Sequence, residues 1–354
     1  MDWLQPTRES ENQLRNFKGL LAALTVALIG VAGIAQTASA AGPPLPVAKN
    51  GNKVKVFATG VAVPTQITFR RKTAFISGGA EDKIKGGLYY VSPGSSKAKR
   101  VPGTPPVAFG VVWHAHRLYV NLGTEIRVLR GWTGKKFRHS RTLVSFNPKN
   151  FNYFTGLEFG PNGKLYTGVG LQFDHKASKR PYSNSVVAIN PRSGKIRTVS
   201  TGLRQPWMLT FLKGMSSPLV TVLGQDQPKN TQAPDLIVKA TPGADFGFPS
   251  CNWSNFKSCR KMGFKDPVLT LGPADPSPSP MGITHKGGKL FVALFNGMTA
   301  KTGPVGPEVI TTNVKGSVIR DFVTGFVAPL VLAHYQGGYL YMGDLTGQVY
   351  RVKA

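Results

Sequence analysis

Acidic residues are scarce in this sequence of 354 residues. It has 16 Asp and Glu against 44 Lys and Arg, which gives a formal net charge of +28 at pH 7. A field of this sign attracts polyanions such as nucleic acid, anionic lipid or acidic cell-wall polymers. The basic residues are spread along the chain and no nucleic-acid-binding motif accompanies them. We therefore interpret the charge as a surface adapted to an anionic exterior, with an anionic polysaccharide or cell-envelope surface as a candidate partner, rather than nucleic acid.

Cysteine is scarcer still, with Cys251 and Cys259 as the only two. Two thiols without a suitably spaced histidine make a poor zinc site. In an exported protein the pair is expected to form a disulfide that closes a short loop. On the chain-entropy view such a loop contributes about 2–3 kcal/mol to stability.

Long amphipathic helical periods are absent, as are a Gly-rich phosphate loop, a G-x-S-x-G elbow and an H-E-x-x-H motif. The 41 Gly and 27 Pro instead indicate many turns. Short runs rich in Val, Ile, Leu, Tyr and Phe recur between Gly, Pro and Asn. This alternation predicts an all-β protein.

The N-terminus has the pattern of a targeting signal. Basic residues precede an apolar run, Gly19–Ala35, and Ala38-Ser39-Ala40 follows as an A-x-A cleavage site. We predict a signal peptide over residues 1–40 and a linker over 41–52, which implies a secreted, periplasmic or cell-envelope location. The alternative is an uncleaved signal anchor, because the apolar run approaches membrane-spanning length.

One motif repeats along the rest of the chain: Pro, two variable residues, an aliphatic residue, a small residue, then Phe or His. Its copies are Pro64–Phe69, Pro206–Phe211, Pro280–His285 and Pro329–His334, with Phe154–Phe159 lacking Pro and a looser sixth copy at Phe109–Val112. The spacing is about 45–50 residues, with one longer interval, and each copy is followed by further short strands. That is the period of a four-stranded propeller blade. We predict a six-bladed β-propeller over residues 53–354.

The two ends of the propeller can be matched from the sequence. Only three strands follow Pro329, while Lys53–Phe57 is a spare strand before the first copy. We expect this N-terminal strand to complete the last blade and to hide sheet edges that would otherwise remain open.

The chain also resembles the glucose/sorbosone dehydrogenases over nearly all of the part that follows the predicted signal peptide. Gly156–Tyr166 is similar to their G-L-x-F-G-P-D-G-K-L-Y, Gly202–Trp207 to their G-x-R-N-P segment, Pro242–Pro249 to P-G-x-x-Y-G-W-P and Gly343–Arg351 to the closing D-x-x-G-x-I-Y-R. The resemblance implies a propeller that carries pyrroloquinoline quinone (PQQ) and calcium in its central channel and oxidises sugars or aldehydes. A histidine of the family removes the hydroxyl proton, as suits an imidazole.

Few of the family's catalytic residues carry over. Asn152 stands where the resemblance places the catalytic histidine, and an amide cannot take up a proton at neutral pH. Arg204 and Gln205 remain as candidates to hold the acidic quinone, and Gly224 and Asp226 lie near the family's calcium loop. Arg204 has the alternative role of a structural ion pair or a hydrogen bond to loop carbonyls.

Three histidines are further candidates, and His175 is the one that could replace the missing base. His175 follows Asp174 in a loop, where it is either a replacement base oriented by Asp174 or an exposed residue of a basic loop. His285 and His334 occupy the aromatic position of the repeat, and packing in the core with one hydrogen bond is expected for both.

Three functions therefore stay open. The first is an exported sugar or aldehyde dehydrogenase using PQQ and calcium. The second is a noncatalytic propeller that binds an anionic extracellular polymer. The third is a calcium-dependent lactonase-type hydrolase, for which no carboxylate cluster is recognisable and which rests on fold alone.

Overall fold

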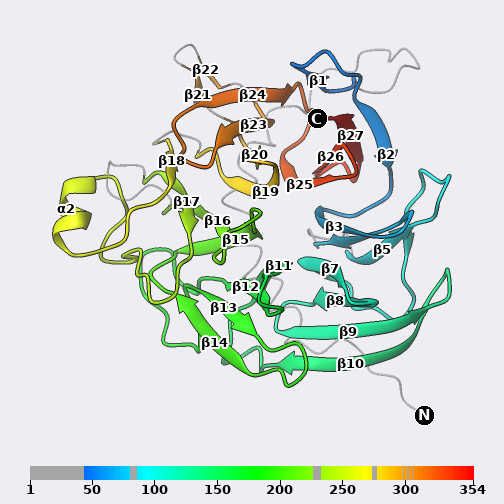
Figure 1. Cartoon of the computed structure of the whole chain (residues 1–354), viewed down its shortest axis with the longest axis horizontal. Coiled ribbons are helices and arrows are strands. Elements are labelled where there is room, and N and C mark those ends of the chain that lie inside the picture. The colour runs from blue at the N-terminus through cyan, green and yellow to red at the C-terminus, as the bar shows by residue number, and fades with distance from the viewer. Residues whose placement is uncertain are drawn as a thin grey trace, which may run out of the picture.

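The computed structural model of the protein describes residues 44–79, 86–225, 233–272, 277–297, 299–300, 303–304 and 306–354. Within them, six small antiparallel sheets stand in a ring, and α2 (Phe256–Lys261) is the one helix (Figure 1). This confirms the all-β, six-bladed propeller. No helix in these ranges is long and apolar enough to cross a membrane. The expected signal peptide lies outside the described residues.

The first three blades follow the chain in order. Blade 1 comprises β3 (Pro64–Arg70), β4 (Thr73–Gly78), β5 (Gly87–Val91) and β6 (Lys99–Arg100). Blade 2 comprises β7 (Gly110–His114), β8 (Arg117–Asn121), β9 (Glu125–Trp132) and β10 (Phe137–Ser145). Blade 3 comprises β11 (Phe154–Phe159), β12 (Leu165–Val169), β13 (Ser185–Ile189) and β14 (Ile196–Ser200).

The other three blades complete the ring. Blade 4 comprises β15 (Gln205–Thr210), β16 (Leu219–Leu223), β17 (Asp235–Lys239) and β18 (Leu269–Leu271). Blade 5 comprises β19 (Pro280–Lys286), β20 (Lys289–Leu294), β23 (Glu308–Asn313) and β24 (Ile319–Thr324), with the small hairpin β21 (Thr299–Ala300) and β22 (Gly303–Pro304) inserted after β20. Blade 6 comprises β25 (Leu330–Gln336), β26 (Tyr339–Asp344), β27 (Val349–Lys353) and β2 (Lys55–Ala58).

Each copy of the repeated motif forms or overlaps the innermost strand of a blade. These inner strands are β3, β7, β11, β15, β19 and β25, and each contacts the next around the ring until β25 contacts β3. Proline suits the beginning of such a strand because it has no N–H to donate to a ladder. The strand next to β11, β12, is buried along its whole length because neighbouring blades cover both faces.

The ring closes as the sequence predicted. β2 pairs with β27, with Lys55 opposite Arg351, so the start of the described chain lies beside its end (Figure 1). The Phe57 ring packs edge-on against Tyr341 with 4.9 Å between ring centroids. Residues 41–52 were predicted to be a linker. Part of this segment instead forms β1 (Val47–Ala48), which pairs with β24 as a fifth strand of blade 5.

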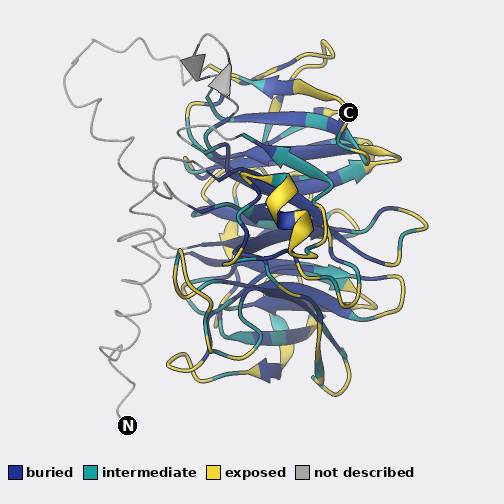
Figure 2. Cartoon of the chain, turned by 90° about the vertical axis from the view of Figure 1, so that its left-hand side faces the viewer, coloured by how far each residue is buried: buried dark blue, intermediate teal, exposed yellow. Residues whose placement is uncertain are grey.

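The ring has two faces, named here by the direction of the inner strands. The start face is where the six inner strands begin, and the end face is where they finish. The long connections from β12 to β13, from β16 to β17 and from β20 to β23 all leave from the start face. Seen edge-on in Figure 2, buried strands fill the body of the ring and exposed residues gather in the loops.

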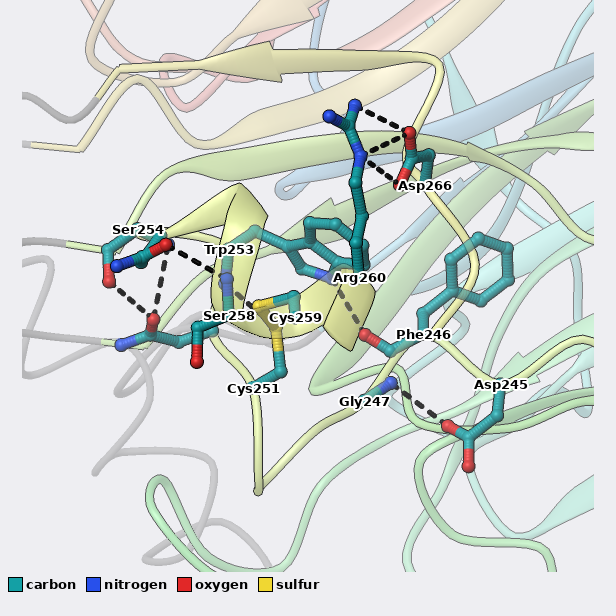
Figure 3. The surroundings of a disulfide bond; sticks show 12 residues. Asp245, Phe246, Gly247, Cys251, Trp253, Ser254, Ser258, Cys259, Arg260 and Asp266 are labelled. Carbon is teal, nitrogen blue, oxygen red and sulfur yellow. Dashed lines mark hydrogen bonds and ion pairs between the residues drawn. A yellow bond between two sulfur atoms is a disulfide. The ribbon is translucent and has the colours of Figure 1, made fainter. Parts of the chain in front are cut away.

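The two cysteines form the predicted disulfide (Figure 3). It lies at α2, which projects from the periphery of the ring beside blade 4 (Figure 1). Cys259 lies in α2, which begins after Asn255, whose side chain accepts a hydrogen bond from Ser258 N at 3.0 Å. Beside the disulfide, Trp253 is buried and its Nε1 donates to Phe246 O at 2.7 Å. The disulfide therefore holds a peripheral loop, at a distance from the central channel.

Candidate functional site

The side chains predicted to carry chemistry gather at the start face over blades 3 and 4. Arg204 immediately precedes β15 and Gln205 begins it, while Asp174 and His175 lie in the connection from β12 to β13. Asn152 lies two residues before β11. Adjacent blades bring these loops together because both inner strands begin on the same side of the ring.

Arg204, Asp174 and His175 form a chain of contacts. The guanidinium of Arg204 is buried, and its Nε donates to Asp174 Oδ1 at 2.5 Å. The other oxygen of Asp174 contacts His175 Nε2 at 2.9 Å. The His175 side chain is half exposed, so one end of the chain of contacts reaches solvent. Arg204 thus makes the ion pair that was one of its two expected roles, and that ion pair also fixes the carboxylate that contacts His175.

Gln205 links blades 3 and 4 through its side-chain oxygen. This oxygen accepts hydrogen bonds from Tyr153 Oη and Leu171 N, both at 3.0 Å. Burial raises the pKa of Tyr153, against the opposing effects of the Arg204 charge and the Gln205 hydrogen bond, so its hydroxyl stays protonated as a donor. The amide nitrogen of Gln205 and the indole nitrogen of Trp207 are buried, and neither has a hydrogen-bond partner among the described residues.

Aromatic side chains lie beside these donors. Trp207 belongs to β15 of blade 4, yet its ring centroid is 6.5 Å from that of Phe109 of blade 2. The Tyr153 ring of blade 3 is 5.9 Å from the same phenylalanine. Three successive blades therefore contribute rings to one buried cluster, in which a few polar groups stand among apolar surface, as is typical of ligand sites.

Asn152 has a structural role. Its Nδ2 donates to Gly170 O at 2.8 Å and to Ser183 Oγ at 2.7 Å, and its Oδ1 accepts from Arg180 Nη1 at 3.1 Å. The residue is buried. Both ends of the amide are therefore used to hold the loop that carries Asp174, and none of its bonds reaches a substrate position.

Asp235 is a buried carboxylate that sequence reasoning did not assign to the site. Its Oδ1 accepts from Gly224 N at 2.7 Å, and its Oδ2 accepts from Ser279 N at 2.7 Å and from Ser277 Oγ. Burial raises its pKa, while these hydrogen bonds and the charge of Arg204 oppose the rise. Ser277 and Ser279 are more than 40 residues away from Asp235 in the sequence, so no local motif indicates this arrangement.

The expected calcium ligands are only partly placed. Gly224 lies at the end of β16, where its N–H is taken by Asp235, and Asp226 falls outside the described residues. Within the described part of the chain, no group of three or more His, Cys, Asp or Glu side chains could hold a metal ion.

No protein-family model and no curated protein matches the sequence. Solved structures do match it over most of their length. The PQQ domain of pyranose dehydrogenase from Coprinopsis cinerea, in its holo form, has a TM-score of 0.69 and 14% identity, over 89% of this chain and 99% of that domain. The chain has the fold of the sugar dehydrogenase propellers.

Two further structures support that assignment of the fold. A protein of a carbohydrate-active enzyme family from Trichoderma reesei has a TM-score of 0.73 and 13% identity, over 90% of this chain and 100% of that one. The soluble aldose sugar dehydrogenase of Escherichia coli, in its apo form, has a TM-score of 0.65 and 17% identity, over 85% of this chain and 99% of that one.

Proposed function

We propose that the protein is an exported, sugar dehydrogenase-like oxidoreductase that takes a sugar or aldehyde at the start face over blades 3 and 4. The observation that carries this proposal is the chain of contacts from Arg204 through Asp174 to His175. The propeller fold shared with sugar dehydrogenases supports it. The charged N-terminal segment with its apolar run supports export.

His175 is the proposed proton acceptor. When its Nε2–H is donated to Asp174, the other ring nitrogen carries the lone pair, and an imidazole in this tautomer suits the removal of a hydroxyl proton. Arg204 fixes the position of the carboxylate, which keeps the ring oriented. Asn152 takes no part in the proton transfer, since its amide is engaged on both sides.

The donors at this site fit PQQ, an acidic and carbonyl-rich cofactor. Arg204 supplies a buried cation, and the side-chain nitrogens of Gln205 and Trp207 are buried donors that lack acceptors among the described residues. Carboxylate and carbonyl oxygens would satisfy them. When bound, PQQ supplies the electron-accepting quinone. Calcium gains no comparable support, because its expected ligand Asp226 lies outside the described residues.

The test is reconstitution of the purified protein with PQQ, with and without calcium. Uptake is followed by the absorption spectrum of the bound cofactor, and turnover by dye reduction with a panel of aldoses and aldehydes. His175→Ala should lower kcat by about 100-fold or more while leaving cofactor uptake unchanged. His139→Ala, at an exposed position of β10, is the matched control and should behave as the parent. Cofactor uptake without any turnover, or equal turnover in both variants, would contradict the proposal.

A second candidate, binding of an anionic extracellular polymer, is favoured by the charge of the outer rim. Between residues 86 and 200 there are 18 Lys and Arg and three Asp and Glu. Exposed basic side chains lie on the outer strands of blades 1 to 3, at Lys99, Arg100, Arg138, Arg141 and Arg197. A cavity of about 240 Å³ between blades 1 and 2 is lined by Arg127 and Arg138.

Retention on an acidic polysaccharide column tests this second candidate. The double charge reversal Arg138→Glu with Arg141→Glu should elute at clearly lower salt than the parent. The matched reversal Lys257→Glu with Lys261→Glu, on α2 of blade 4, should elute as the parent does. Equal shifts for both pairs would show a response to net charge alone, and would remove the rim as a binding surface.

The third hypothesis, a calcium-dependent lactonase-type hydrolase, gains no support from the described residues. They contain no cluster of metal-binding side chains.

A further inference from the structure

A separate cavity opens in the half of the central channel that lies toward the end face. Its volume is about 330 Å³, at the small end of the range for ligand pockets. Five of the six inner strands line it, namely β3, β11, β15, β19 and β25. Gln205 begins β15 at the start face and Thr210 ends it at this cavity, about 17 Å away along an extended strand. The cavity is therefore distinct from the site around Arg204.

Glu158 of β11 supplies the carboxyl group on the cavity wall. Burial raises its pKa to about 8, and the hydrogen bond from Phe159 N only partly offsets that rise. Near neutral pH the side chain is mostly the neutral acid, which has an O–H to donate. It differs in this respect from Asp174 at the start face, whose carboxylate is held by an arginine.

His285 and His334 face this cavity, which corrects part of the sequence-based expectation. Both were expected to pack in the core with one hydrogen bond, but both line the cavity. His334 does have a hydrogen bond, between Nε2 and Gln336 Oε1 at 3.2 Å, and burial lowers its pKa. In contrast, His285 Nδ1 is buried without any hydrogen-bond partner among the described residues. A buried polar atom of this kind normally has a partner.

A positive charge lies at the mouth of the cavity. Lys286 follows His285 on β19, and its Nζ contacts the backbone oxygen of Ala354 at the end of the chain and lies 5.8 Å from the ring centroid of Tyr335. No arginine lies among the residues that line the cavity, and the one acidic residue among them is Glu158. The formal charge of the whole chain is +28. The electrostatic field around the cavity therefore favours an anion over a cation.

We propose that this cavity binds a small hydroxy-carboxylate, such as a sugar acid, together with one proton held on Glu158. One oxygen of the ligand carboxylate would accept from the Glu158 O–H and the other from His285 Nδ1–H, which would give the buried nitrogen its missing partner. Lys286 contributes the neighbouring positive charge. The hydroxyl of Thr210 on the wall is available to a hydroxyl group of the ligand.

This proposal makes affinity depend on pH. If only the protonated form of Glu158 binds, affinity for the anion should fall about 25-fold between pH 7.5 and pH 9.5. The ionisable groups that face Glu158 in the cavity are His285 and Lys286 from β19 and His334 and Tyr335 from β25, while the lining residues of β3 and β15 are uncharged. Tyr166 of β12 is its partner in the ladder. The chosen window lies above the usual titration of histidine and below that of lysine.

Isothermal titration calorimetry of the purified protein with D-gluconate tests the proposal. Sorbitol, which has the same number of carbons and no carboxylate, and glucosamine, which carries an amine, are the comparison ligands. Gluconate should bind and the other two should not. Binding should take up a proton at pH 8.5, seen as a dependence of the measured heat on the ionisation enthalpy of the buffer.

Three variants complete the design. Glu158→Gln keeps a donor without the charge, so it should bind gluconate at pH 7.5 and lose the pH dependence. His285→Ala should weaken binding at least about tenfold, whereas His139→Ala on the outer rim should not change it. His175→Ala should also bind as the parent does, which separates this cavity from the start face. Thermal melts confirm that each variant is folded.

Several results would overturn the proposal. These are absence of gluconate binding, equal binding of sorbitol, affinity that rises with pH, and a loss of binding in His175→Ala that His285→Ala does not show. None of them bears on cofactor uptake or sugar turnover at the start face, so the two proposals stand or fall separately.

Discussion

Replacing Glu158 with glutamine should make the protein more stable above neutral pH. The carboxyl has a pKa near 4.5 in the unfolded chain and about 8 in the folded protein. Between these values the unfolded chain releases the proton while the folded chain keeps it. Stability of the parent is therefore lost as pH rises from about 4.5 to 8, with no loss below that window and the full loss above it.

The size of the effect follows from the difference between the two pKa values. At about 1.4 kcal/mol for each tenfold change in proton affinity, the full difference corresponds to about 5 kcal/mol. Glu158 is partly exposed at the cavity wall, and solvent screening reduces this figure. We expect Glu158→Gln to raise the free energy of unfolding by about 2–3 kcal/mol at pH 8.5, and to change it little at pH 4.

Urea denaturation of parent and variant at pH 4, 6 and 8.5 measures this difference. Glu125→Gln is the control of opposite sign. Burial favours a higher pKa for Glu125, but its hydrogen bonds from Arg127 and Thr142 lower it overall. Its contribution to stability is thus present above the unfolded pKa and is lost as pH falls. The reasoning on Glu158 is refuted if its variant differs from the parent by the same amount at pH 4 and pH 8.5.

Three further perturbations test the fold and the start face. Deleting Gly51–Thr59 removes β2 and unpairs β27, so we expect a loss of about 5 kcal/mol and a Tm roughly 10 °C lower by calorimetry, whereas Lys53→Ala should leave the melt unchanged. The double variant Cys251→Ser with Cys259→Ser should lose about 2–3 kcal/mol in urea denaturation, and equal stability would remove the entropic role of the disulfide. Asn152→His introduces the residue type that the glucose/sorbosone dehydrogenases have at the similar position. It should lower the free energy of unfolding by about 1–3 kcal/mol in urea without raising turnover, because it breaks buried hydrogen bonds. Increased turnover would contradict our interpretation of this position.

Some properties of the protein could be derived from its sequence because they arise from local or periodic patterns. The repeated motif gave the number of blades, since each copy provides one inner strand. The spare strand before the first copy gave the closure between β2 and β27. The two cysteines, eight residues apart, gave the disulfide. Each of these results depends on the spacing of motifs or residues along the chain, which can be read from the sequence.

The sites depended on the tertiary structure. Glu158 and His285 are 127 positions apart, yet both line one cavity, because a channel is assembled from one residue of each inner strand at a given level. Asp235 begins β17 of blade 4 and meets Ser277 and Ser279, which lie in the segment leading into β19 of the next blade. The repeat places a residue on an inner strand, but the other strands decide whether it faces the channel and set its pKa and hydrogen-bond partners. The charge state of Glu158 thus depends on burial by strands of several blades, and it cannot be derived from the sequence around Glu158 alone.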